Sequence, residues 1–153
     1  MNVLQRLDSL SKGNFMRNVF MINGASGGMI GAAYFRELYA EKVRGKSINL
    51  QDHVYAENIS KDLLNPIFSS FITRDLASPA KYFNVGSYSY IKDRAYAFEE
   101  KLNENTQYLL NKSLKDYIFE EAQAKIPMMI FNAAITRDGR KLIVGTQPMT
   151  FLM

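Results

Sequence analysis

The residues best suited to chemistry in this sequence are five consecutive ones, Gly24-Ala25-Ser26-Gly27-Gly28. They place a serine in a G-x-S-x-G pattern, directly after an apolar run and directly before a run of small residues. This order predicts a strand, a sharp turn and a helix, which together form the nucleophile elbow of α/β-hydrolase-type enzymes. The elbow glycines allow a strained backbone to approach its neighbours without a clash at Cβ. We therefore predict that Ser26 is a nucleophile.

A helix that begins at the elbow would place its N-terminus beneath the serine. Backbone N–H groups at a helix N-terminus favour negative charge. The N–H of Gly27, the residue after the nucleophile, is therefore the expected oxyanion donor. Gly31, Ala32 and Ala33 would let this helix pack close to the preceding strand.

A nucleotide-binding turn of the Rossmann type is an alternative interpretation of the same glycines. The elbow supplies its first two glycines, but the third position is Ile30. The acidic ribose-binding residue should close a second strand about 20 residues further on. Glu41 lies at that distance but falls within the predicted helix. Tyr88 and Lys92 form a Y-x-x-x-K pair that follows the turn too closely to match a short-chain dehydrogenase.

A serine hydroxyl is a poor nucleophile until a base takes its proton. His53 is the single histidine, and it lies soon after the elbow helix in a polar stretch. In α/β-hydrolases the histidine comes last in the sequence, after the acid. We therefore predict that His53 is a surface or loop residue and that the chemistry uses a serine without histidine.

The elbow and the small residues that follow it, 24–33, resemble those of the patatin-like phospholipases. Segment 126–142 is similar to the buried strand and hairpin of that family. The resemblance implies a serine–aspartate dyad that hydrolyses lipid acyl esters, with no cofactor or metal. It implies an α/β fold in three layers, with helices on both faces of a mostly parallel sheet.

Two elements of the family are not found in the chain. No glycine-rich G-G-G-x-R/K-G loop precedes the elbow, and the one Asp-Gly pair, Asp138-Gly139, is followed by Arg140 instead of glycine or alanine. Asp138 is either the dyad base or the tip of a β-hairpin, since Asp-Gly between two strand-like runs is a hairpin signal. The hairpin fits better. The chain is therefore expected to be the central part of a patatin-like domain, with the base and part of the oxyanion hole outside it.

Composition limits the other function classes. The chain has 153 residues, 47% of them hydrophobic, which suits one globular domain. It has no cysteine, so disulfides and cysteine-based zinc sites are excluded. The net charge of +4 comes from lysines and arginines interleaved with acids, so no nucleic-acid partner is expected. No signal peptide or membrane span is visible, the native N-terminus is expected to be absent, and the compartment is not assigned.

The expected partner is a lipid or another acyl ester, with transient contact to a membrane surface. A catalytically inactive pseudo-hydrolase or lipid-binding module is the main alternative function. A Rossmann-type nucleotide-binding domain is a weaker one.

The elements expected to position these residues form a single partial domain over 1–153. Spacing predicts an amphipathic helix over 2–12 and the strand, elbow and helix over 17–43. Residues 44–125 are predicted to be a mainly helical insertion or lid-like region. Residues 126–146 are predicted to form a buried strand and a hairpin.

Within the helical region, three details are predicted. Residues 47–60 are irregular, and Ser60 caps a helix over 61–73 with a buried apolar face. The aromatic residues of 78–90 fill a core beneath a long loop or, alternatively, line a lid or acyl pocket. Helices then follow from Ile91 and over 109–122, with Ser113 and Asp116 forming a capping box.

Overall fold

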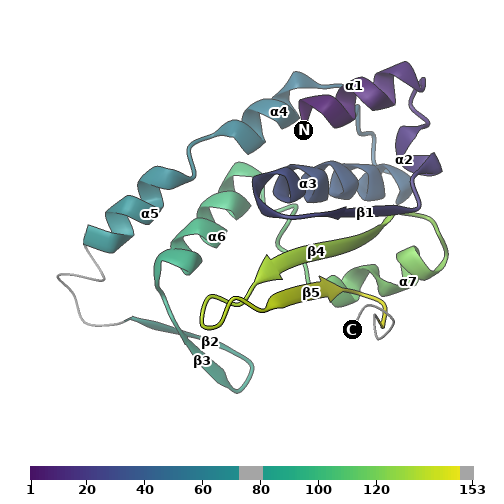
Figure 1. The fold of residues 1–153 in the computed structure, drawn as a ribbon. Helices are drawn as coiled ribbons and strands as arrows, with labels where there is room; N and C mark the ends of the chain where they lie inside the picture. The colour runs from purple at the N-terminus through teal and green to yellow at the C-terminus, as the bar shows by residue number, and fades with distance from the viewer. Residues whose placement is uncertain (73–80, 149–153) are drawn as a thin grey trace.

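The computed structural model describes residues 1–72 and 81–148 and has a mixed α/β fold (Figure 1). Three strands form one sheet in the order β1-β4-β5, and two more form a separate hairpin. The strands are β1 (Met21–Gly24), β2 (Tyr82–Val85), β3 (Tyr88–Ile91), β4 (Met128–Ala134) and β5 (Lys141–Gly145).

The sheet is mixed. β1 runs parallel to β4, with Gly24 opposite Phe131, whereas β4 and β5 are antiparallel. The chain reverses direction through the predicted Asp138-Gly139 turn, where Gly139 has a φ of 73°. The α/β class is thus confirmed, while the described residues contain one parallel pair in place of the predicted mostly parallel three-layer sheet.

The longest helix, α3, packs on the sheet, and other helices extend away from it (Figure 1). Two short ones, α1 and α2, precede β1, and the long α3 follows it directly. The helices are α1 (Asn2–Leu10), α2 (Phe15–Asn18), α3 (Ser26–Val43), α4 (His53–Ser60), α5 (Leu64–Ser70), α6 (Arg94–Asn105), the 3₁₀ helix η2 (Leu114–Tyr117) and α7 (Ile118–Ala122).

The core forms around α3. Tyr34, Phe35 and Leu38 of this helix are buried beside residues of α2 and of the loop after α3. On the sheet side, Met29 packs against Met129 of β4. A Cβ at Gly31 would lie 3.2 Å from the Met1 nitrogen, so this glycine allows the chain start to lie against the helix. Apolar residues around most of its circumference make α3 a buried central helix.

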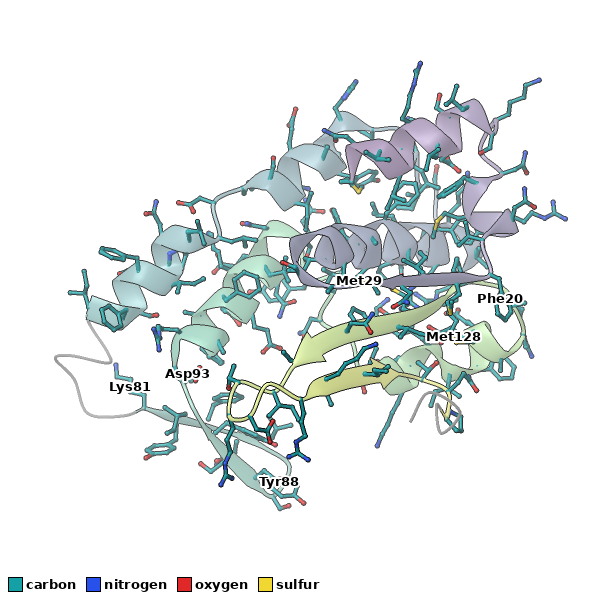
Figure 2. All side chains as sticks on the ribbon, in the orientation of Figure 1. Phe20, Met29, Lys81, Tyr88, Asp93 and Met128 are labelled. Atoms are coloured by element: carbon teal, nitrogen blue, oxygen red, sulfur yellow. The ribbon has the colours of Figure 1, made fainter. Side chains whose placement is uncertain are left out.

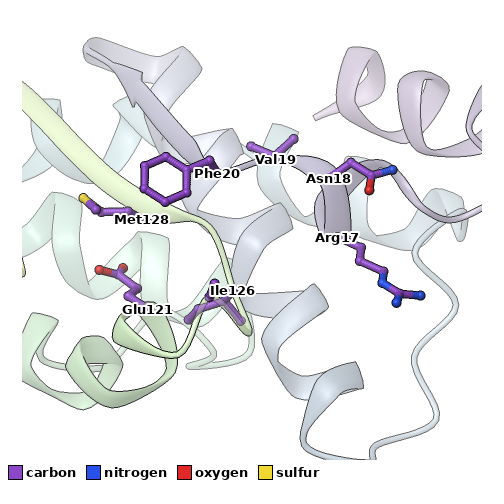
Figure 3. A pocket seen from close by; sticks show the side chains of 8 residues that line it. Arg17, Asn18, Val19, Phe20, Glu121, Ile126 and Met128 are labelled. Carbon is purple, nitrogen blue, oxygen red and sulfur yellow. The ribbon is translucent and has the colours of Figure 1, made fainter.

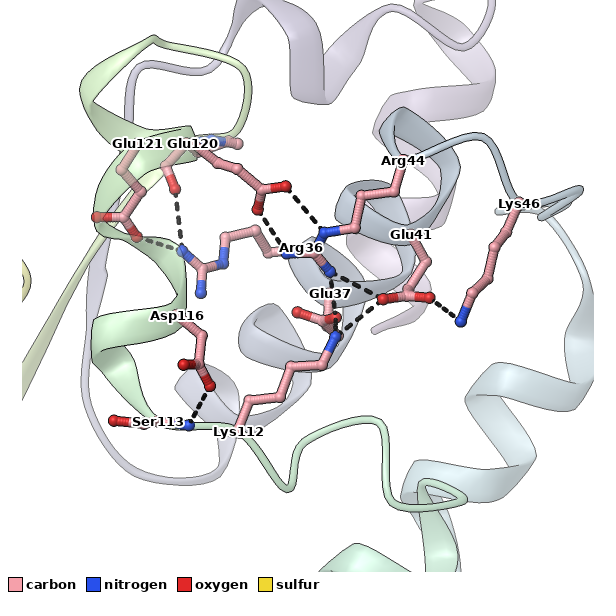
Figure 4. Close-up of polar contacts among 11 residues, drawn as sticks. Arg36, Glu37, Glu41, Arg44, Lys46, Lys112, Ser113, Asp116, Glu120 and Glu121 are labelled. Atoms are coloured by element: carbon pink, nitrogen blue, oxygen red, sulfur yellow. Dashed lines mark hydrogen bonds and ion pairs between the residues drawn. The ribbon is translucent and has the colours of Figure 1, made fainter.

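The C-terminal half of α3 is held by buried and half-buried ion pairs (Figure 4). Arg36 pairs with Glu121 of α7, and its guanidinium lies 4.0 Å from the ring centroid of Tyr117. Glu41 pairs with Arg44 at 2.8 Å and with Lys112 at 2.9 Å. These contacts fix η2 and α7 against the helix that begins at Ser26.

Two helix boundaries differ from the predictions, and at each an aspartate side chain accepts a hydrogen bond from the first turn of the helix. Residues 53–60 are helical rather than irregular, since the Asp52 side chain accepts a hydrogen bond from the Val54 N–H at 3.0 Å. The next helix begins at Leu64, where Asp62 accepts from the Leu64 N–H at 2.8 Å. Ser60 is the last residue of α4 and not the predicted cap.

The aromatic segment is a hairpin and not the predicted loop over a core. β2 and β3 pair through a tight turn in which Gly86 adopts a φ of 61°. Tyr82, Tyr88 and Tyr90 are exposed. The Ser78-Pro79 part of this prediction lies outside the described residues, and the helix predicted from Ile91 begins later, after its Asp93 cap.

Two predicted buried faces are largely open. β4 was predicted to be buried on both faces, but only its first half is, and Ala133 and Ala134 are exposed. The predicted apolar face of the 61–73 helix is also open, with Leu64 73% and Phe68 65% exposed. Neither segment has enough neighbouring chain to cover it within the described residues. The Ser113 and Asp116 capping box is confirmed.

Candidate active site

Ser26 lies at the junction of β1 and α3 with a left-handed backbone, at φ 58°. Ala25 before it is extended, with φ −144° and ψ 167°. A left-handed conformation at a residue other than glycine costs about 1 kcal/mol or more and is a common feature of functional turns. The chain therefore makes the sharp strand-to-helix turn that was predicted, with Ser26 at its apex.

The glycines of the turn differ in their surroundings. A Cβ at Gly24 would lie 3.4 Å from the Met29 sulfur, which is ordinary contact. At Gly27 and Gly28 a Cβ would meet nothing within 4 Å. A close approach of the backbone to a neighbour was also expected at Gly28, but no described atom lies near enough to clash with a side chain at that position. Crowding therefore does not require a glycine at Gly28.

The N-terminus of α3 offers backbone donors beside Ser26. The N-cap Ala25 has no side-chain cap hydrogen bond. The first N–H groups of a helix have no partner within the helix, and they favour an anion. The N–H of Gly27 belongs to this first turn, in the position expected of an oxyanion donor.

Ser26 and Gly27 line an open groove of about 590 Å³ between α3, α6 and the junction of α4 with α5. Most of its other lining is apolar, with Lys61 and Asp62 as charged exceptions. The remaining lining residues are Ile30, Ile59, Ser60, Leu63, Leu64 and Phe98. An apolar groove beside an exposed hydroxyl suits a substrate with a hydrocarbon part.

Asn132 is a candidate positioning residue that the sequence analysis did not single out. Its side-chain amide on β4 donates to the Asn23 side chain and to the Gly24 carbonyl, the latter at 3.2 Å. It therefore ties the neighbouring strand to the residues just before the turn. An asparagine inside an otherwise apolar strand was the available signal.

Asp138 lies at the tip of the β4–β5 hairpin. Its carboxylate accepts a hydrogen bond from the Arg140 backbone N–H at 3.1 Å and pairs with the Arg140 guanidinium at 2.7 Å. These contacts hold the pKa of Asp138 below its usual value. A carboxylate with a lowered pKa is a weaker base. The hairpin role accounts for Asp138, and no hydrogen bond links it to Ser26 in the described structure.

The other sequence candidates lie apart from the groove. His53 opens α4 and lines a different groove with Gln5 and Gln51. Glu41 is buried in α3 among its ion pairs, which leaves it unsuited to a ribose hydroxyl. Tyr88 lies in β3 and is exposed, and the Lys92 ammonium lies 4.9 Å from the Tyr96 ring centroid.

A second, smaller pocket of about 150 Å³ lies at the opposite end of β1 (Figure 3). Arg17 and Phe20, which come before β1, line it together with Glu121 of α7 and Met128 of β4. Since β1 begins here and ends at the serine turn, this pocket is separate from the candidate site.

No family model, curated protein or solved structure matches the chain. Over residues 1–72 and 81–148, no group of three or more metal-ligating side chains is found that could hold a metal ion. No helix in that same part is long and apolar enough to cross a membrane.

Proposed function

We propose that this chain carries the nucleophile of a serine-dependent lipid acyl hydrolase of patatin-like type. The observation that supports it most is the left-handed backbone of Ser26 between β1 and α3. A strained serine at the apex of a strand-to-helix turn is the arrangement that a nucleophile elbow needs.

In this proposal the Ser26 hydroxyl attacks an ester carbonyl while a base takes its proton. The oxyanion receives a hydrogen bond from the Gly27 N–H, and collapse of the intermediate expels the alcohol, which takes up the proton. Water then hydrolyses the acyl-serine. Since Asp138 is engaged with Arg140, the base and the remaining oxyanion donors are proposed to come from outside this chain.

The groove supports a proposal for the substrate class. Its apolar lining by Ile30, Leu63 and Phe98 suits an acyl chain, while Lys61 and Asp62 place charges of both signs at the groove. The proposed substrate is accordingly an acyl ester of a lipid.

A fluorophosphonate probe tests the nucleophile. We expect slow covalent labelling that Ser26→Ala abolishes and Ser60→Ala leaves unchanged, because Ser60 lines the same groove but ends a helix. Losing one oxyanion donor alone costs about a hundredfold or more in rate, so slow labelling is the expected result. Equal labelling of the two variants, or none of the parent chain, contradicts the proposal.

A non-catalytic lipid-binding module is the second candidate. It is favoured by the lack of any hydrogen-bonded base at Ser26 in the part of the chain that the structure describes. Hydrolysis of a chromogenic short-chain ester discriminates among these possibilities. Rapid turnover that depends on both Ser26 and Asp138 would return Asp138 to the role of base, whereas lipid binding without probe labelling would favour the module.

A further inference from the structure

The β2–β3 hairpin exposes apolar side chains that nothing in the described structure covers. Tyr88 is 69% and Val85 57% exposed. A two-stranded hairpin is only marginally stable in water by itself. The exposed apolar side chains of this hairpin therefore favour contact with another apolar surface.

The strand register gathers these side chains on one face. Phe83 pairs with Tyr90, and Val85 pairs with Tyr88, so the four side chains share a face of the hairpin. The Tyr96 ring of α6 covers Phe83 at a centroid distance of 4.8 Å. Tyr88 lies at the end of the hairpin remote from its base at residues 81 and 93, as Figure 2 shows. The outer half of the face is an open apolar tip.

The charges of the hairpin have one sign. Segment 81–92 contains a lysine at each end and no acidic residue. The carboxylate of the adjacent Asp93 accepts hydrogen bonds from the Ala95 and Tyr96 N–H groups, so it serves as a helix cap. The hairpin thus has an apolar tip with aromatic and aliphatic side chains and positive charge at its other end. This order matches an anionic lipid surface, where tyrosines favour the interface and lysines favour the head groups.

We propose that the β2–β3 hairpin docks the protein on an anionic lipid bilayer. Val85 and Tyr88 enter the interfacial layer, and Lys81 faces the phosphates. The hairpin leads directly into α6, which packs on α5 and carries Phe98 of the Ser26 groove. Docking would thus hold the groove close to lipid, but it needs no chemistry at Ser26 and goes beyond the proposed function.

A single tryptophan tests insertion directly, because the chain has none. With vesicles of phosphatidylcholine and phosphatidylglycerol, the Tyr88→Trp variant should show a blue-shifted emission that brominated lipid quenches. Tyr108→Trp is the matched control, since Tyr108 is 51% exposed but lies outside the hairpin. Its emission should not change. Equal quenching of the two variants, or no quenching of either, overturns the proposal.

Vesicle co-sedimentation measures how much single side chains contribute to the affinity for the vesicles. Val85→Ser should weaken binding about tenfold, from the lost apolar burial. Val3→Ser, at a position 71% exposed on α1, should not. Lys81→Gln should cost about fivefold on the anionic vesicles and nothing on phosphatidylcholine alone, and Lys115→Gln is its control.

Three other results would overturn the proposal. They are unchanged binding of the Val85 variant, no binding of the parent chain, and a dimer in solution that Tyr88→Ser dissociates without any vesicle binding. The last result would assign the hairpin to a second copy of the chain. Ser26→Ala should bind vesicles like the parent, so failure of docking and failure of the proposed hydrolase activity are distinguished.

Discussion

At the scale of single residues, Ser26 is the position where sequence pattern and backbone geometry coincide. Its φ of 58° is a conformation that glycine adopts without cost and other residues adopt with strain. Its exposed hydroxyl lies beside an apolar groove and at the uncapped N-terminus of α3. Strain of this kind clusters at functional sites. The other non-glycine residues with a left-handed backbone among those described follow the ends of helices, whereas Ser26 lies between a strand and a helix.

This strain can be measured without any substrate. Ser26→Gly should have a free energy of unfolding about 1 kcal/mol higher than Ser26→Ala, because glycine relieves the left-handed backbone. At Ser9, an exposed residue within α1, the order should be reversed, since alanine favours a helix by about 1 kcal/mol over glycine. Urea denaturation of the four variants checks both differences. Equal stability of the two Ser26 variants would show that the turn is unstrained.

At the scale of elements, α3 connects the serine turn to the rest of the fold. Its first turn holds the candidate site, its middle forms the core, and its last turns pair with η2 and α7. Arg36 is central to this contact because its guanidinium donates to Glu121 and to the Pro127 carbonyl, the latter at 3.4 Å. Glu121 also accepts from Thr146, which follows β5. One ion pair thus joins α3, α7 and the end of the sheet.

Removing Arg36 leaves the buried Glu121 carboxylate without its cationic partner. Arg36→Ala should therefore lower the free energy of unfolding by about 3 kcal/mol. Arg6→Ala, at an exposed position of α1, should change it by less than about 0.5 kcal/mol. In a double-mutant cycle, Arg36→Ala with Glu121→Ala should cost clearly less than the sum of the single changes. Strict additivity would mean that the two side chains do not interact.

At the scale of the whole molecule, charge pairing makes stability depend on pH. Burial by itself raises the pKa of Glu41, but hydrogen bonds from Lys46, Lys112 and Arg44 outweigh burial and lower it from 4.5 to about 2. A group whose pKa is lowered by folding stabilises the folded state above its unfolded pKa. That contribution is lost as the pH falls.

The free energy of unfolding should accordingly fall between about pH 4.5 and pH 2 as Glu41 takes up a proton. At pH 7 we expect the free energy of unfolding of Glu41→Gln to be about 2 kcal/mol lower than that of the parent. The loss is not larger because part of the pairing is with the exposed Lys46, where solvent screens the charges. The gap should narrow as the pH approaches 2. Urea titrations at several pH values check this, and a gap that is constant with pH would exclude Glu41 as its source.

Features whose causes lie within a few residues could be predicted from the amino-acid sequence alone. The turn around Ser26, the hairpin at Asp138-Gly139 and the capping box of Ser113 and Asp116 depend on local backbone sterics and on side-chain hydrogen bonds to nearby amides. The helix after Ser26 followed from the same local pattern. These features were predictable because no distant segment is needed to form them.

Which segments meet and which stay exposed depends on tertiary packing between distant parts of the chain. Arg36 and Glu121 are 85 residues apart, and their pairing depends on how α7 packs against α3. The mixed strand order, the hairpin in place of a loop and the exposure of Tyr88 likewise depend on which surfaces find a neighbour. The spacing of apolar residues indicates which face of a segment is suited to burial. Whether that face is buried depends on the neighbouring elements, which the segment's own sequence does not specify.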